Sequence, residues 1–299
     1  MRAVRFDEYG PADRLRVVEA ETPEPGPGQV RVAVRAAGVN PVDWKLRSGD
    51  LPHFPVTPPH VPGIELAGVV DAVGRGADFT VGQEVFGWAD TGAYAEYALA
   101  SDLAAKPERL SWTDAAALTA AGETSLRVLR LLAVVPGETL LVHGAGGAVG
   151  GVVVQLALAR GATVVGTAGE RSRDRVRSLG AVPVRYGPGL TERVRAVAPQ
   201  GIDAALDAAG HGALPALMEL RGGADRVLTI ADPAAFELGV AFSGEADRDP
   251  ALLAELADLV LAGELRIAHA ASFPLERARE AHELSETGHS GGKIVIEIR

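Results

Sequence analysis

The 299-residue chain contains no cysteine, which excludes disulfide bonds and metal sites built from thiolates. It also lacks any tract of clustered lysine and arginine. Its 29 basic side chains are outnumbered by 39 acidic ones, giving a formal net charge of −10. Because neutralising nucleic-acid phosphates requires clustered cations, we expect no nucleic-acid partner.

Long apolar runs are absent as well. No uninterrupted apolar segment reaches the roughly 18 residues of a membrane span. The first eight residues, Met1–Glu8, turn acidic at once and lack the apolar core of an export signal. We therefore expect no membrane partner and a cytoplasmic protein, whose length is typical of two domains.

The most informative stretch follows an apolar run at 140–143. Residues 144–150 read Gly-Ala-Gly-Gly-Ala-Val-Gly and lead into an alanine- and leucine-rich segment. The spacing fits the dinucleotide fingerprint with its first glycine replaced by alanine, and small residues let a backbone close on a pyrophosphate. An ordinary tight turn is the alternative, which context must decide. The predicted cofactor-binding residues of this turn are Ala145, Gly146, Gly147, Ala148, Val149 and Gly150.

The texture of the chain changes near residue 111. Before it, short strands alternate with turns, as at 29–36. After it, Ser111–Asp114 can cap a helix over 115–132, and strands alternate with helices, which predicts a doubly wound parallel sheet in an α/β fold. These strands are expected to begin near Leu140, Thr163, Val182, Asp203, Arg226 and Leu238.

Two domains are predicted from this change. Residues 1–112 form a mostly β domain to which 251–299 return, and 113–250 form the domain with the parallel sheet. A helix is expected over 250–262, followed by one more helix and a closing strand.

The second strand of the sheet, 163–167, ends where an NAD enzyme would carry an acidic residue for the ribose hydroxyls. Ala168 stands there instead, and Arg171, Ser172 and Arg173 offer contacts to a 2′-phosphate. NADPH is therefore predicted, with Thr167 at the strand end beside it. Glu170 leaves NAD open, because a shift of one turn would make it the ribose acceptor.

Several motifs in order resemble the quinone oxidoreductases of the zinc-free medium-chain dehydrogenase/reductase superfamily. The motifs span most of the chain and read AGVNPVDWKLRSG (37–49), PGIELAG (62–68), the glycine turn, SLGA (178–181), DAAG (207–210), FPL (273–275) and GKIV (292–295). The resemblance implies a GroES-like, partly open β-barrel domain beside a Rossmann domain, and a homodimer. Asn40 and Ile64 stand where the zinc enzymes have a cysteine and a histidine, so a catalytic zinc is not expected.

The resemblance also implies individual roles. Asn40 is the expected polar group of the catalytic site, and Asp43 either orients it or pairs with Arg47. Thr124 matches a threonine near the nicotinamide carboxamide, and Tyr186 matches a tyrosine at the NADP phosphate or adenine edge. Ala209 belongs to the matching DAAG motif and is expected at the cofactor.

Other side chains keep two interpretations. Glu123, where the family has an apolar residue, is either solvated or reshapes the pocket. His53 is either an exposed loop residue or a proton donor. His143, Tyr94 and Tyr97 are interpreted as packing residues.

The leading functional hypothesis is an NADPH-dependent reductase of quinones or α,β-unsaturated carbonyls. An enoyl-thioester reductase is the second hypothesis, although this chain lacks the tyrosine that those enzymes carry shortly after the glycine matching Gly49. A cofactor-binding sensor or interaction protein is the third. The small-molecule acceptor is not fixed by the sequence.

Overall fold

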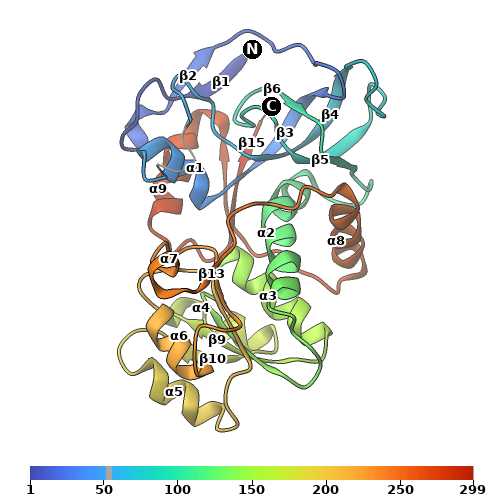
Figure 1. Cartoon of the computed structure of the whole chain (residues 1–299). Coiled ribbons are helices and arrows are strands. Elements are labelled where there is room, and N and C mark those ends of the chain that lie inside the picture. The colour runs from blue at the N-terminus through green and yellow to red at the C-terminus, as the bar shows by residue number, and fades with distance from the viewer. Residues whose placement is uncertain (52–55, 299) are drawn as a thin grey trace. The chain divides into compact units, whose positions relative to one another are not determined.

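The computed structural model describes residues 1–51 and 56–298, which divide into two compact units. The first unit comprises Met1–Ala120 and Arg248–Arg299, and the second comprises Ala121–Asp247. The helix α2 (Trp112–Leu131) contains the point at which the two are divided. Figure 1 labels many of the elements of both.

The second unit is built on a parallel sheet with the order β10-β9-β8-β11-β12-β13. Its strands are β8 (Thr139–His143), β9 (Thr163–Ala168), β10 (Val182–Arg185), β11 (Ala204–Asp207), β12 (Val227–Thr229) and β13 (Ala241–Phe242). Its further helices are α3 (Ala148–Ala159), α4 (Glu170–Ser178), α5 (Leu190–Val197), α6 (Leu214–Arg221) and α7 (Ala235–Leu238).

This order confirms the predicted doubly wound sheet. All five residues of β8 are buried, as expected of a central parallel strand covered by helices on both faces. The chain winds outward from β8 to β10, then returns to β11 on the other side of β8, and ligands bind at such a switch point. One predicted strand start is wrong, because Leu238 ends α7 and the last strand begins at Ala241.

The first unit contains a seven-stranded sheet in the order β14-β15-β3-β4-β5-β7, with β6 paired to β3, and a separate β1-β2 pair. The strands are β1 (Arg2–Arg5), β2 (Arg16–Glu19), β3 (Val30–Val39), β4 (Glu65–Val73), β5 (Glu84–Trp88), β6 (Tyr97–Ala100), β7 (Leu103–Ala105), β14 (His269–Pro274) and β15 (Lys293–Glu297). Its helices are α1 (Pro41–Ser48), α8 (Pro250–Ala262) and α9 (Ala278–Glu286), with short 3₁₀ turns η1 (Ala12–Arg14) and η2 (Leu275–Arg277).

Strand β3 is the centre of this sheet. Val30, Val32 and Val34 point to the core in the alternation that the sequence predicts, and the strand continues to Val39. The closing strand β15 pairs antiparallel with β3, while β14, which the sequence did not predict, pairs parallel with β15. The end of the chain therefore completes a sheet that its beginning starts.

Two helix starts follow their capping residues. The Ser111 hydroxyl accepts the Asp114 backbone N–H at 3.0 Å ahead of α2, as predicted. Asp249 caps α8 by accepting the Ala251 backbone N–H at 2.8 Å. Among the described residues, no helix is long and apolar enough to cross a membrane.

A buried histidine lies in the core of the first unit. His282 on α9 is fully buried, and its ring meets that of Tyr94 edge-on at 5.6 Å. Within the described residues neither ring nitrogen has a hydrogen-bond partner. Burial, aided by the nearby Arg47 guanidinium, lowers the pKa of His282 to about 3.

This burial predicts an acid-sensitive fold. The unfolded chain binds a proton at His282 near its usual pKa of about 6.5, whereas the folded chain binds it only near 3. Wild type should therefore lose about 1.4 kcal/mol of unfolding free energy per pH unit from this group as the pH falls through that window. In His282→Leu this contribution should vanish, as measured by urea unfolding at pH 7 and 4.5. The exposed His289→Leu is the control, and equal pH slopes in wild type and His282→Leu would contradict the assignment.

Candidate functional site

The glycine turn connects β8 to α3. Gly144 has a φ of +86°, and its carbonyl oxygen accepts the Gly147 backbone N–H at 2.9 Å. Helix α3 begins at Ala148, so Ala148, Val149 and Gly150 are its first residues, whose N–H groups have no acceptor within the helix. The turn thus presents free amides at the positive end of a helix, as a pyrophosphate requires.

Close packing explains why the turn consists of small residues. A Cβ at Gly150 would overlap the Gly144 carbonyl oxygen, and one at Gly146 would lie 2.5 Å from the Ser172 hydroxyl. The Ala209 Cβ would lie 3.0 Å from a Cβ at Gly144, so the segment that follows β11 also packs closely against the turn. Ala145 is fully buried beneath it.

Thr167 at the end of β9 fixes the turn. Its hydroxyl accepts the Gly144 N–H at 3.0 Å, and its carbonyl accepts the Ala145 N–H at 3.1 Å. The same hydroxyl lies 2.9 Å from Nδ1 of His143, which is buried as predicted. Burial lowers the pKa of His143, although the nearby Asp207 opposes this. Thr167 therefore holds the backbone of the turn.

The first turn of α4 carries the residues predicted for a 2′-phosphate. Arg171 and Arg173 are exposed, and Ser172 is half-buried with its hydroxyl donating to the Gly169 carbonyl at 3.3 Å. Glu170, the competing ribose acceptor, is exposed at the first position of α4. Tyr186 lies beside this turn, because its Oη would be 3.3 Å from a Cβ at Gly169.

Arg175 is a residue that the sequence analysis missed. Its guanidinium donates to the Gly146 carbonyl oxygen, and its partial burial lowers its pKa. The signal was available, because Ser172 and Arg175 are three residues apart and so share a face of α4. Arg175 ties the middle of the glycine turn to α4.

The Glu123 side chain on α2 is not solvated, so that interpretation is wrong. It is fully buried, and its carboxylate accepts from Arg127 Nε at 2.7 Å and from the Asp247 backbone N–H at 2.8 Å. Arg127 also donates to the Thr124 hydroxyl at 3.2 Å and to the Ser243 hydroxyl. Thr124 is therefore held by a buried ion pair within the second unit.

Asn40 precedes α1 in the first unit and is half-buried. Its side-chain Nδ2 donates to Glu65 Oε1 at 2.7 Å, and its Oδ1 accepts from Lys293 Nζ at 2.6 Å. Lys293 also forms an ion pair with Glu65 Oε1 at 2.5 Å. Both charged side chains are almost completely buried, and each of the three groups contacts the other two. We call Asn40, Glu65 and Lys293 the polar cluster.

Glu65 and Lys293 lie within two of the family motifs, at 62–68 and 292–295, but the sequence predicted no role for them. Each is a charged residue at the start of a mostly apolar strand, Glu65 in β4 and Lys293 in β15. Buried charges of opposite sign require partners, so this pattern was the available signal.

Asp43 orients the backbone of Asn40 and does not pair with Arg47. Its Oδ2 accepts the Asn40 backbone N–H at 2.8 Å and the Tyr94 hydroxyl at 3.0 Å, while Arg47 pairs with Glu286. Burial raises the pKa of Asp43 to about 7, although both hydrogen bonds oppose this. Burial and Asp43 in turn raise the pKa of Tyr94. His53 lies outside the described residues.

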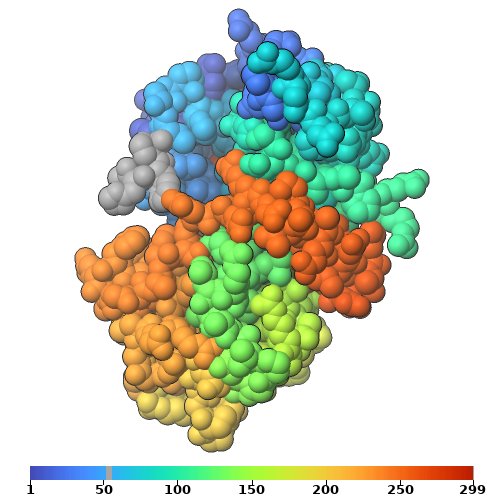
Figure 2. All heavy atoms as spheres, turned by 45° about the vertical axis from the view of Figure 1, so that its right-hand side comes forward, coloured from blue at the N-terminus to red at the C-terminus, as the bar shows by residue number. Residues whose placement is uncertain are grey.

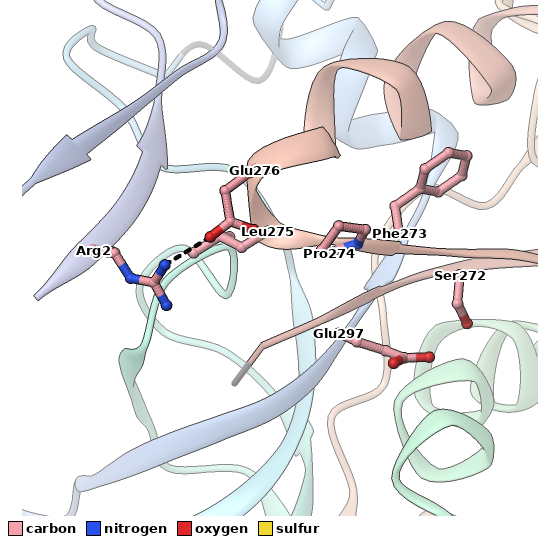
Figure 3. Close-up of a pocket in the computed structure, with 7 residues that line it drawn as sticks. All are labelled: Arg2, Ser272, Phe273, Pro274, Leu275, Glu276 and Glu297. Carbon is pink, nitrogen blue, oxygen red and sulfur yellow. Dashed lines mark hydrogen bonds and ion pairs between the residues drawn. The ribbon is translucent and has the colours of Figure 1, made fainter.

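A separate hollow of about 480 Å³ lies between β1, β14, η2 and the end of β15. Figure 3 shows the ion pair between Arg2 and Glu276, 2.6 Å long, at its edge. None of its lining residues is a predicted site residue.

Comparison with known proteins identifies the family. The family model described as "Alcohol dehydrogenase GroES-like domain" matches residues 26–108, and that described as "Zinc-binding dehydrogenase" matches 179–296. A human quinone oxidoreductase is 33% identical over 322 residues, covering 99% of this chain and 98% of the relative. The chain belongs to the quinone oxidoreductase family.

Solved structures agree with this membership. An NAD-dependent alcohol dehydrogenase matches with a TM-score of 0.88 at 30% identity over the full length of both chains. A mycobacterial protein in complex with NADPH matches with a TM-score of 0.89 at 27% identity over 99% of each chain. This member of the quinone oxidoreductase family is therefore an oxidoreductase with a site for a nicotinamide cofactor.

The donor set does not fit a catalytic zinc, although one matching family model is described as zinc-binding. The chain has no cysteine, and Asn40 and Ile64 are poor substitutes for zinc ligands. Within residues 1–51 and 56–298, no group of three or more His, Asp or Glu side chains could hold a metal. Glu65 is already paired with Lys293.

Adjacent glycines of α3 give a test of the glycine turn. Gly150→Ala should destabilise the protein by about 1–3 kcal/mol, because its Cβ overlaps the Gly144 carbonyl. Gly151→Ala, whose Cβ would have no neighbour closer than 3.7 Å, should stabilise α3 by about 0.5–1 kcal/mol. Urea unfolding measures both, and effects of the same sign would contradict the packing described here.

Proposed function

We propose that this protein is an NADPH-dependent, zinc-independent oxidoreductase that reduces quinones or α,β-unsaturated carbonyls. The orientation of the Asn40 amide is the observation that carries the proposal. A bound NADPH supplies the hydride, and the protein positions the acceptor and offers a hydrogen bond to its oxygen.

The polar cluster decides which end of the Asn40 amide is available. Lys293 has only donors, so its contact fixes Oδ1 of Asn40 on the lysine side. The Glu65 carboxylate accepts one of the two N–H bonds of Nδ2. The second N–H of this half-buried side chain is left to donate to a carbonyl or quinone oxygen, where negative charge develops during reduction.

The second unit supports NADPH as the cofactor. The residues that would hold its pyrophosphate are Ala145, Gly146, Gly147, Ala148, Val149 and Gly150. Of these, Ala148, Val149 and Gly150 offer the N–H groups at the start of α3, while Ala145 and Gly147 use theirs to close the turn. Arg171, Ser172, Arg173 and Tyr186 would hold the 2′-phosphate, since Ala168 offers no carboxylate. Thr124 and Ala209 would lie at the nicotinamide side. Glu170 is the residue that would accept the ribose hydroxyls of NADH if that cofactor were bound instead.

Zinc independence rests on the donor set. A catalytic zinc requires three protein ligands and an open position, which these side chains do not provide. Acceptors that take up hydride without a Lewis acid, such as electron-poor quinones and enones, suit such a site. The homodimer and the cytoplasmic location stay predictions.

The first functional prediction concerns Asn40. Asn40→Ala should lower kcat with the preferred quinone or enone by about 10²-fold, because a hydrogen bond to the developing oxyanion is lost. NADPH oxidation is followed against quinone, enone and enoyl-thioester panels, with NADH in parallel. An unchanged rate would contradict the role of Asn40. Faster turnover of enoyl thioesters would favour that class, and tight NADPH binding without turnover would favour a sensor.

The second prediction concerns what holds the amide. Lys293→Met alone should destabilise the fold by about 3–5 kcal/mol, because it leaves Glu65 buried and unpaired. The double variant Glu65→Gln/Lys293→Met removes both charges and keeps an amide beside Asn40. It should fold, yet lose about tenfold in kcat with an unchanged KM for NADPH, since the amide is free to rotate. Wild-type kcat in the folded double variant would contradict the orienting role.

A further inference from the structure

The loop between β10 and α5 carries Tyr186 and has little structure of its own. Gly187 and Gly189 have φ values of +89° and +76°, a conformation that glycine adopts readily. Tyr186 itself is 43% exposed. Such a loop holds an aromatic side chain in one place only if another group fixes its backbone.

Arg193 on α5 is that group. Its guanidinium donates to the carbonyl oxygens of four successive residues, and the donor–acceptor distances lie between 2.8 and 3.4 Å. Nε binds the Arg185 carbonyl, Nη1 that of Pro188, and Nη2 those of Tyr186 and Gly187. Only a planar fork of five donors can serve four carbonyls at once, which a lysine ammonium cannot do.

Gly189 provides the space for this contact. A Cβ at this position would lie 2.9 Å from Nη1 of Arg193. The loop thus wraps around the guanidinium, and its yellow segment with α5 lies at the surface of the second unit in Figure 2.

The wrapped loop aims Tyr186 at the end of β9. Its Oη would be 3.3 Å from a Cβ at Gly169, the residue that precedes α4, and its ring meets His143 edge-on at 6.5 Å. Ser172 and Arg173 follow within the first turn of that helix. The Tyr186 hydroxyl therefore lies beside the cations and hydroxyl proposed above for a 2′-phosphate.

We propose that Arg193 is a positioning residue for cofactor choice. Arg193 holds the Tyr186 loop so that the Tyr186 hydroxyl can donate to the 2′-phosphate of NADPH. The guanidinium of Arg193 itself donates to the backbone carbonyls of the loop. This inference rests on the proposed NADPH function and names a residue that sets its specificity.

The test uses nucleotide fragments and measures binding by calorimetry. The probe 2′,5′-ADP carries the 2′-phosphate and 5′-ADP lacks it. Arg193→Met should weaken binding of 2′,5′-ADP about tenfold, the loss expected for one hydrogen bond to a charged group, and change that of 5′-ADP less than about threefold. Arg193→Lys should weaken the binding of 2′,5′-ADP nearly as much as Arg193→Met does.

Arg195 offers a matched control on the same helix. It pairs with Glu219 at 2.8 Å, and both side chains are more than half exposed. Arg195→Met removes the same charge at a similar position and should leave both affinities unchanged, which separates loop positioning from a general loss of positive charge.

A double-mutant cycle tests whether Arg193 acts through Tyr186. Tyr186→Ala should weaken 2′,5′-ADP binding as Arg193→Met does, and the double variant should be no weaker than Tyr186→Ala alone. Additive losses, or an unchanged preference for 2′,5′-ADP in both Arg193→Met and Arg193→Lys, would overturn the role of Arg193 and leave the NADPH proposal standing. Equal binding of both nucleotides by wild type would overturn the NADPH preference and this role with it.

Discussion

The ion pair between Lys293 and Glu65 is the interaction on which the polar cluster of the first unit depends. Removing two charges from water costs several kcal/mol for each, so the pair is stable only if its remaining polar atoms are bonded. Glu65 meets this condition by accepting the Ala120 backbone N–H at 2.6 Å, and both charges bind Asn40. Gly38 is required beside it, since a Cβ there would overlap the Glu65 carboxylate. One cluster therefore joins β4, β15 and the start of α1, and fixes an amide.

The second unit depends on a different constraint, the close approach of backbones where a side chain would not fit. Gly150 lets the start of α3 approach the end of β8, Gly146 leaves room for Ser172 of α4, and Gly144 leaves room for the segment that follows β11. Two polar side chains then fix this arrangement: Thr167 accepts the Gly144 N–H, and Arg175 donates to the Gly146 carbonyl. The turn can therefore form because its glycines lack side chains, and hydrogen bonds with Thr167 and Arg175 stabilise it.

The sequence predicted most of the second unit because its signals are local. Apolar runs separated by amphipathic segments give the parallel strands, and the small residues at 144–150 give the turn. Asn40 was found as a polar candidate, yet its partners were not, because Lys293 lies 253 residues further along the chain. The same holds for Asp43, whose hydroxyl partner Tyr94 is 51 residues away, and for the contact of Glu123 with the Asp247 backbone, 124 residues away. The other partner of Glu123, Arg127, is only four residues away, so that pairing was open to prediction from the sequence. Strand β14 was missed because it is a partly exposed edge strand without a clear alternation.

By itself, the sequence determined the fold class, the position of the glycine turn and the residue types near it, since periodicity and the lack of side chains act between neighbours in the chain. Only the tertiary structure decided that the charges of β4 and β15 are paired and which way the Asn40 amide faces. Hydrogen bonds and ion pairs join side chains wherever folding brings them within about 3 Å, and that encounter depends on strand order and register. The sequence pattern of a single segment therefore does not predict these contacts.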